Sequence, residues 1–441
     1  MDIFKIFRQA QHIQPISDDP IRLKKEYRYW RTRTMYTSMI GYALFYFVRK
    51  NISIAMPVME IELGISKSDL GLFLTLSGVL YGVSKFVNGF IGDQVNPRYF
   101  MAVGLLLSAL MNFLFGLSNA VITFGIFWLF NGWFQGMGFP PCANSLTHWF
   151  TPKERGVKFA LWNTSHSIGA SLVLVLSGYL VSYNWRLVFF VPGILAVLGA
   201  LFIINRLRNT PESLGLPPVE QFFGDSQVTP DKESELSKME FKQFIKKYVF
   251  GNPYIWILSF ANFFLYTVRY VILYWGPTFL KEMKGVELHY AGWIVAGYEI
   301  FGILGMLAGG WIMDNIFKGR GGRACLFYML TCSIGVFIFW KLETQSLLIN
   351  SLLLFLIGFS IYGPQSLVGI IAANLAAKRA AATAIGVTGF FGYASTVLSG
   401  WGLGALVEYG GWNTGFLMLV ISAAVATILF GFTWNARYFE F

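Results

Sequence analysis

The stretch Gly41–Lys50, GYALFYFVRK, places an arginine inside a run of aromatic and aliphatic residues. An arginine in an apolar membrane helix costs about 2.5–3.5 kcal/mol or more, so a function or a binding partner has to compensate for it. The pattern Tyr46–Arg49 (YFVR) recurs 220 residues later as Tyr266–Arg269 (YTVR). In both copies the tyrosine lies three residues before the arginine, which predicts one shared helix face. Two such cations in a repeated chain indicate that both halves bind one anion.

Composition places the chain in the membrane. Of the 441 residues, 55% are hydrophobic and 13% are charged, whereas soluble proteins carry about 25% charged residues. Several apolar segments exceed the roughly 18 residues that a membrane helix needs, and they lack the two-residue alternation of barrel strands. We therefore expect an all-α integral membrane protein. The polar, basic first 35 residues are expected to contain no removable signal peptide.

Apolar segments predict six membrane spans in each half of the chain. They are residues 36–59, 68–92, 98–117, 121–145, 156–182, 187–205, 253–281, 290–314, 324–341, 347–373, 380–406 and 412–434. The polar segment between the sixth and seventh spans is expected to contain a short surface helix at 238–247. The predicted domains are an N-terminal segment (1–35), a first half (36–205), a linker (206–250) and a second half (251–441).

The formal net charge of +11 has a topological explanation. Twenty-five of the 34 Lys and Arg residues lie in the terminal segments and one set of alternate loops, whereas five lie in the other set. Basic residues accumulate on the cytoplasmic side of membrane proteins. We therefore expect both termini in the cytoplasm, the lipid bilayer as the surroundings, and no nucleic-acid partner.

Further landmarks repeat at the same interval. Asp93 closes the second span and Asp314 the eighth, 221 residues apart. Arg155 and Arg379, which precede the fifth and eleventh spans, are 224 residues apart. Six plus six spans in one orientation predict parallel halves related by an axis along the membrane normal, with the substrate site between them near the midplane.

The loops after spans two and eight, each acidic and then basic, resemble the signature of the major facilitator superfamily. Narrower matches resemble its organophosphate:phosphate antiporter family. They are Tyr42-Ala43, Arg49-Lys50-Asn51, Tyr81–Phe86 (YGVSKF), Trp133–Gly138 (WFQGMG), Pro140-Pro141-Cys142, Lys153–Gly156 (KERG), Trp162-Asn163, Val268-Arg269-Tyr270, Gly319–Gly322 (GRGG) and Tyr362-Gly363-Pro364. The resemblance covers nearly the whole chain. It implies a twelve-helix transporter of a bacterial inner membrane that exchanges a phosphorylated sugar, most simply hexose 6-phosphate, for inorganic phosphate, without a metal, cofactor or enzymatic activity.

Arg49 and Arg269 are the leading candidates for substrate binding. A guanidinium offers a planar fork of donors that suits phosphate oxygens and stays charged. Alternatively, each arginine pairs with a buried carboxylate and only fixes packing. Glu299 is the clearest acid within a span, and one carboxylate cannot neutralise both cations. The resemblance agrees, because both arginines match the family's phosphate-binding pair.

Other cations and the histidine are weaker candidates. Lys85 lies about 12 Å inside the end of its span and either adds positive field at the site or snorkels to the surface. Lys50 points roughly 100° away from Arg49 around the helix, which favours a helper or structural role. His166 titrates near neutrality, as a phosphate ester does; it is expected to contact substrate, the alternative being a hydrogen-bonded interior histidine.

Neutral donors and acids complete the predicted set. The tyrosines expected to line the pathway are Tyr42, Tyr46, Tyr266, Tyr362 and Tyr393; packing or interfacial anchoring is the alternative. Glu299 is expected to be an ion-pair partner rather than a proton carrier. Structural or coupling roles are expected for Gln135, Asp93 and Asp314. The three cysteines lack metal-ligand spacing.

Three other functions stay open. The uncharged stretch Tyr393–Gly404 and the motif Asn252–Trp256 (NPYIW) resemble the family's hexose-phosphate sensor, which would signal to a membrane kinase. Tyr274 stands where the family's glycerol-3-phosphate transporter has an acid, which leaves the exact sugar phosphate open. A proton-coupled drug exporter would use a membrane acid and an apolar cavity, and the two arginines argue against it.

Overall fold

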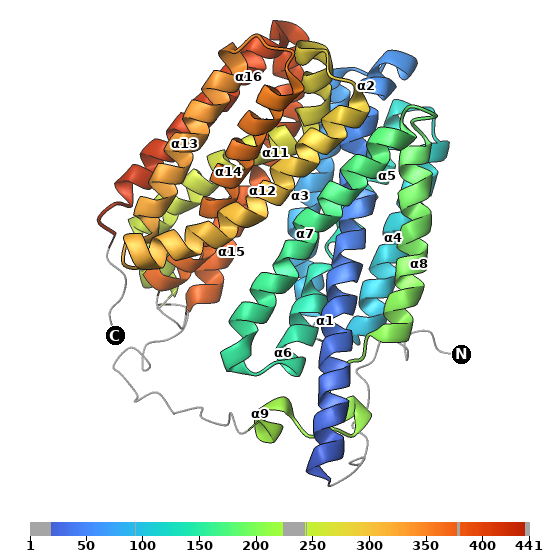
Figure 1. Cartoon of the computed structure of the whole chain (residues 1–441), viewed down its shortest axis with the longest axis vertical. Coiled ribbons are helices and arrows are strands. Elements are labelled where there is room, and N and C mark those ends of the chain that lie inside the picture. Colours follow the sequence, from blue (N-terminus) through green and yellow to red (C-terminus); the bar gives the residue numbers. More distant parts are fainter. Residues whose placement is uncertain (1–18, 93, 224–242, 244, 377–379, 437–441) are drawn as a thin grey trace. The chain divides into compact units, whose positions relative to one another are not determined.

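The computed structural model describes residues 19–92, 94–223, 243, 245–376 and 380–436, and this part of the chain is mainly helical (Figure 1). Its contacts define two compact units. Unit 1 comprises residues 1–52, 80–173 and 183–229, and unit 2 comprises residues 53–79, 174–182 and 230–441. These units reflect packing, whereas the predicted halves 36–205 and 251–441 follow the sequence repeat and stay a prediction.

Two long helices contribute to both units, and the remaining helices belong entirely or almost entirely to one or the other. The shared helices are α3 (Lys67–Gly92) and α7 (Pro152–Leu180). Unit 1 also contains α1 (Pro20–Lys50), α4 (Pro97–Leu117), α5 (Val121–Gln135), α6 (Phe139–Trp149), α8 (Leu187–Arg206), the 3-10 turn η2 (Glu212–Leu214) and α9 (Val219–Phe222).

Unit 2 contains nearly all of α2 and the helices of the second half of the chain. These are α2 (Ile52–Leu63), η4 (Lys246–Phe250), α11 (Pro253–Lys284), α12 (Leu288–Trp311), η5 (Ile312–Ile316), α13 (Gly321–Lys341), α14 (Leu347–Leu375), α15 (Ala381–Ala394), η7 (Val397–Gly402) and α16 (Leu403–Phe432). The elements η4, η5 and η7 are short π-helical segments.

The helices account for the predicted spans. Within the described ranges, nine helices are long and apolar enough to cross a membrane. One of them, residues 383–432, has 50 residues, room for two crossings of about 20 residues each, and it bends at Gly411, where φ is 72°. The other two predicted spans are broken helices, since α2 follows α1 directly and α6 follows α5.

The first and fourth predicted spans are therefore interrupted helices, which the apolar pattern did not indicate. The first helix also begins at Pro20 rather than at residue 36, because Asp19 caps it by accepting a hydrogen bond from the Ile21 amide (3.0 Å). The fourth span breaks after Gln135. A Cβ at Gly136 would lie 2.1 Å from the Ser84 Oγ, so glycine permits this close approach of two helices.

Part of the predicted linker folds against α1. Leu207, Leu216 and Val219 are buried in the core of unit 1, and the Tyr27 ring stacks on Phe222 with centroids 4.6 Å apart. In Figure 1 the N-terminal part of α1 projects past α6 and α8, and α9 lies beside it. The predicted surface helix at 238–247 falls largely outside the described residues.

Polar contacts attach the segment 53–79 to the rest of unit 2. The Lys67 ammonium forms ion pairs with Glu60 and with Glu282, the latter at 3.1 Å. The amide of Ser68 donates a hydrogen bond to the Glu408 carboxylate (2.9 Å). The start of α3 is thereby fixed to α11 and α16 by charge-assisted contacts.

Individual helices expose apolar stripes of the kind that face lipid. On α12 the side chains at spacings of three and four residues are between 41% and 63% exposed; they are Ile300, Leu304, Leu307 and Trp311. Such a stripe is stable only against an apolar medium or another apolar surface. It agrees with the predicted membrane location.

Candidate anion-binding site

A kink in α1 positions Arg49. Val48 departs from helical geometry (φ −94°, ψ 15°), and a kink releases a carbonyl that must find another donor within the membrane. The Val48 carbonyl accepts hydrogen bonds from Asn112 (2.9 Å) and Asn131 (2.8 Å). Asn51, at the end of α1, donates to the Asn112 side-chain oxygen (2.8 Å). Three buried asparagines therefore fix the backbone on both sides of Arg49.

The Arg49 side chain lies among aromatic rings. Arg49 is 7% exposed, and its guanidinium carbon lies 4.0 Å from the centroid of the Tyr81 ring and 5.7 Å from that of Tyr46. The predicted shared face of Tyr46 and Arg49 is confirmed. Ring faces attract a cation without neutralising it.

Further rings extend this cluster in unit 1. The Tyr42 ring lies 5.5 Å from that of Tyr46 and 4.6 Å from that of Trp162 on α7. The Lys85 ammonium lies 4.1 Å from the ring centroid of Phe139 on α6. We call Tyr42, Tyr46, Arg49, Tyr81, Lys85, Phe139, Trp162 and His166 the Arg49 cluster.

His166 occupies the α7 side of the Arg49 cluster. It is 5% exposed, its Nδ1 lies 3.1 Å from the Ser167 Oγ, and its ring meets the Tyr46 ring edge-on with centroids 5.6 Å apart. Tyr46 thus contacts both His166 and Arg49. An imidazole and a guanidinium therefore belong to one cluster of side chains.

We expect His166→Ala to weaken phosphate binding while leaving expression and the unfolding temperature close to those of the wild type. The edge-on contact of the imidazole with the Tyr46 ring and its hydrogen bond with Ser167 are each worth about 1 kcal/mol. Binding and thermal unfolding should be measured on one purified sample. A large loss of stability with unchanged affinity of the folded fraction would assign His166 to packing instead.

Arg269 occupies the matching position in unit 2. It is 4% exposed on α11, and its guanidinium carbon lies 5.5 Å from the ring centroids of both Tyr266 and Tyr270 and 4.7 Å from that of Tyr362 on α14. The shared face of Tyr266 and Arg269 is confirmed. The repeated sequence pattern therefore produces the same local arrangement twice, a buried guanidinium surrounded by tyrosine rings.

A hydrogen-bonded chain links Arg269 to Glu299. The Arg269 Nη2 donates to the Tyr362 hydroxyl (3.2 Å), and that hydroxyl donates to the Glu299 carboxylate. Glu299 is 1% exposed on α12. The Nε of Arg269 is buried and has no acceptor among the described residues. Tyr362 thus orients the guanidinium, and one N–H remains available to a ligand.

The remaining predicted residues lie at differing distances from these clusters. Tyr266, Arg269, Tyr270, Tyr362 and Glu299 are called the Arg269 cluster. The Tyr393 ring centroid lies 6.3 Å from that of Tyr266, at the edge of this cluster. Lys50 is buried, at 1% exposure. Gln135 donates to the Ser108 hydroxyl (3.3 Å) and so joins α5 to α4. Asp314 is exposed on η5, and Asp93 falls outside the described residues.

Sequence reasoning did not assign the residues that complete each group. Tyr81, Phe139, Trp162 and Tyr270 contact the predicted side chains, and of these Phe139 lies between two of the family motifs. Tyr270 follows Arg269 directly and carries no periodic signal of its own. Tyr81, Trp162 and Tyr270 had a usable signal, since all three lie in motifs that carry the family resemblance.

Comparison with solved structures confirms the fold. A bacterial homolog of the human lysosomal transporter Spinster, in an inward-facing and unoccupied conformation, matches with a TM-score of 0.74 and 16% identity, over 93% of this chain and 99% of that one. The nucleoside transporter NupG matches with a TM-score of 0.72 and 13% identity, over 92% and 100% of the two chains.

Curated relatives match over nearly their whole length. A probable hexose phosphate transport protein of Chlamydia trachomatis is 41% identical over 98% of this chain and 97% of the relative. A glycerol-3-phosphate transporter of Bacillus subtilis is 39% identical over 98% of each. The membrane sensor protein UhpC of Escherichia coli is 37% identical over 96% of each.

The family model described as Major Facilitator Superfamily matches residues 38–400. With this match, the predicted all-α fold of twelve membrane helices in two six-helix halves is confirmed, and so is the prediction that the chain is a membrane transporter rather than an enzyme. The chain belongs to the major facilitator superfamily and, within it, to the organophosphate:phosphate antiporter family.

Proposed function

We propose that this protein imports a phosphorylated sugar, most simply hexose 6-phosphate, in exchange for inorganic phosphate by alternating access. The observation that carries the proposal is the repeated arrangement of Arg49 and Arg269, each buried among tyrosine rings at equivalent places in the repeat. The relatives named as hexose phosphate and glycerol-3-phosphate transporters support the substrate class.

Both arginines bind the phosphate group that hexose 6-phosphate and inorganic phosphate share. Each guanidinium donates to two phosphate oxygens, and His166 with the neighbouring tyrosines adds neutral or titratable donors. When the site is empty, the negative charge of the phosphate no longer lies beside the two buried guanidiniums, which disfavours the conformational change. This penalty couples the outward flux of phosphate to the inward flux of the sugar phosphate.

Reconstitution tests the proposal directly. Liposomes containing the purified protein and loaded with radiolabelled phosphate should release it when unlabelled phosphate or glucose 6-phosphate is added outside, and only slowly without either. Glycerol 3-phosphate, added in a parallel sample, measures the selectivity. If the protein binds glucose 6-phosphate but the liposomes release no radiolabelled phosphate, the protein is a sensor rather than a transporter.

Sensing is the second candidate. The stretch Tyr393–Gly404 carries no charged residue, and the relative named membrane sensor protein UhpC is 37% identical. In that case external hexose phosphate would shift a conformational equilibrium that a membrane kinase reads. The same liposome experiment separates the two candidates.

We further propose a bacterial inner-membrane location with both termini in the cytoplasm, since 25 of the 34 basic residues lie in the terminal segments and one set of loops. Cysteines placed at Arg155 or Arg320 should resist a membrane-impermeant maleimide applied to intact cells. A cysteine at Asn184 should react. Labelling of a cysteine at 155 or 320, with no labelling at 184, would show that the protein has the opposite orientation in the membrane.

A further inference from the structure

Unit 1 contains a cavity that is separate from the Arg49 cluster. It lies beside the N-terminal part of α1 and has a volume of about 530 Å³. Its walls come from α1, the turn before α7, the first part of α7, and the segment after α9. The charged side chains that line it are Lys24, Arg28, Arg31, Lys158 and Glu154.

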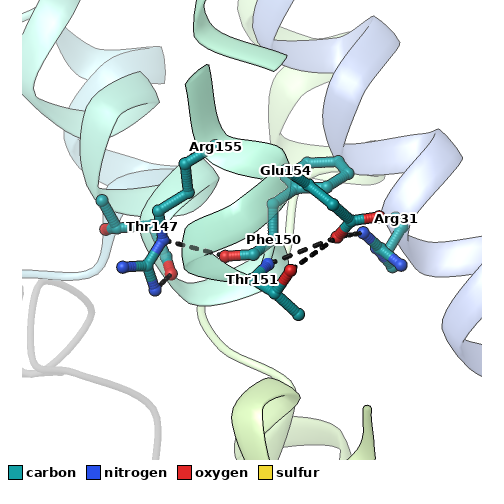
Figure 2. A network of polar contacts seen from close by, with 6 residues as sticks. All are labelled: Arg31, Thr147, Phe150, Thr151, Glu154 and Arg155. Carbon is teal, nitrogen blue, oxygen red and sulfur yellow. Dashed lines mark hydrogen bonds and ion pairs between the residues drawn. The ribbon is translucent and has the colours of Figure 1, made fainter. Parts of the chain in front are cut away.

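Arg31 is held in place inside this cavity. Its guanidinium carbon lies between two phenyl rings, 4.7 Å from the centroid of Phe150 and 4.8 Å from that of Phe223. Its Nη2 forms an ion pair with Glu154 (Figure 2). The Nε is buried and has no acceptor among the described residues. A fixed guanidinium with an unused buried N–H is prepared to bind one more acceptor.

Glu154 neutralises only part of this charge. Its Oε2 also accepts hydrogen bonds from the amide (3.3 Å) and hydroxyl (3.2 Å) of Thr151, as in a helix capping box (Figure 2). Lys24, Arg28 and Lys158 form no ion pair with a carboxylate of the described residues. Three cations around a cavity therefore have no acidic partner in this part of the chain.

Residues that line the cavity lie on the same faces of α1 and α7 as residues of the Arg49 cluster. On α1 a stripe with spacings of three and four residues runs through Arg28, Arg31, Met35, Met39, Tyr42, Tyr46 and Arg49. On α7 the residues at every fourth position are Glu154, Lys158, Trp162 and His166. The 18 residues from Arg31 to Arg49 correspond to about 27 Å of helix. The cavity and the Arg49 cluster thus lie on one side of unit 1, at different depths.

We propose that this cavity is a second anion site, which binds inorganic phosphate or a phosphate monoester on its way to or from Arg49. The proposal deepens the proposed function and rests on it. A concave site with excess positive charge raises the local concentration of anions and speeds their capture. A lipid headgroup carries the same phosphate chemistry, but the continuous stripes toward Arg49 favour a free anion.

Protection of an engineered cysteine measures binding in the cavity. Met35→Cys places a thiol in the lining, while the native Cys142, Cys325 and Cys332 are buried. The full-length protein would also carry Arg49→Lys, which weakens binding at the central site. In phosphatidylcholine nanodiscs, inorganic phosphate should slow labelling by a neutral maleimide several-fold.

Paired charge variants identify the cause of the protection. Lys24→Gln with Arg28→Gln removes two lining cations and should raise the phosphate concentration for half-protection about tenfold or more. Arg22→Gln with Lys25→Gln removes the same charge from exposed positions of α1 outside the cavity. This control pair should leave the protection unchanged.

Two results would overturn the proposal. Equal loss of protection in both double variants would indicate a general charge effect rather than a site. Protection by phosphatidylglycerol in the nanodisc, with none by inorganic phosphate, would assign the cavity to a lipid headgroup. Because the assay needs no transport, its result is independent of exchange. Protection in the Arg49→Lys protein, together with failure of the wild-type protein to exchange phosphate in liposomes, would refute the proposed function and leave the anion site standing.

Discussion

Arg269→Lys is expected to abolish most phosphate exchange although it keeps the charge, and Arg49→Lys is expected to do the same. An ammonium is a point charge that cannot reproduce the planar fork of donors. Loss of one charge-assisted hydrogen bond costs roughly 1.5–3 kcal/mol, or about ten- to a hundred-fold in affinity. Exchange in liposomes and phosphate binding in detergent, both normalised to folded protein, provide the measurements.

The exposed Arg22 provides the matched control, because Arg22→Lys makes the same chemical change outside both clusters. The double variant Arg49→Lys with Arg269→Lys should lose less affinity than the sum of the singles, since residues that share a ligand are not additive. A well-expressed Arg269→Lys protein that exchanges phosphate at the wild-type rate would refute the shared binding of one phosphate by both arginines.

Glu299→Gln is expected to destabilise the ligand-free protein strongly. The carboxylate is buried and accepts a hydrogen bond from the Tyr362 hydroxyl, which in turn accepts a hydrogen bond from Arg269. Removal of the acid leaves a buried cation without its negative counterpart, a change that costs about 3–5 kcal/mol in buried pairs. Added phosphate should restore part of this stability, because it supplies negative charge to Arg269 and binds only the folded state.

Thermal unfolding with and without phosphate tests this expectation. Glu287→Gln is the control, since the side chain of Glu287 is 75% exposed at the start of the same helix. Tyr362→Phe should have an intermediate effect, because it removes the hydrogen-bonded link but keeps both charges. If Glu299 instead carries protons, Glu299→Gln would leave stability unchanged and remove the pH dependence of exchange.

The fold was largely predictable from local sequence. Apolar length predicts a membrane helix because backbone groups in lipid have no other donors and acceptors. The breaks in the first and fourth spans were harder to predict. Asn51 and Gly136 are single residues, and whether they interrupt a helix depends on the helices packed against them. The early start at Pro20 was missed because that part of α1 is polar, and its stability comes from packing against residues of the predicted linker.

The site was predictable only in part. The repeat located Arg49, Arg269 and the tyrosine three residues before each, because both members of a pair lie on one helix. Tyr81 and Tyr362 reach the arginines from other helices, and helical periodicity says nothing about which faces of two helices meet. Glu299 was identified as an acid within a span, but its link to Arg269 through Tyr362 follows from packing.

The sequence by itself determined the membrane class, the spans and the two equivalent arginines, because hydrophobic length and repeat spacing are local properties of the chain. Tertiary structure alone decided how each arginine is held: the asparagines on the Val48 carbonyl, the Tyr362–Glu299 link, and the cavity in which Arg31 lies between Phe150 and Phe223. These contacts join residues far apart in the chain, and their energies depend on burial that exists only after the helices have packed.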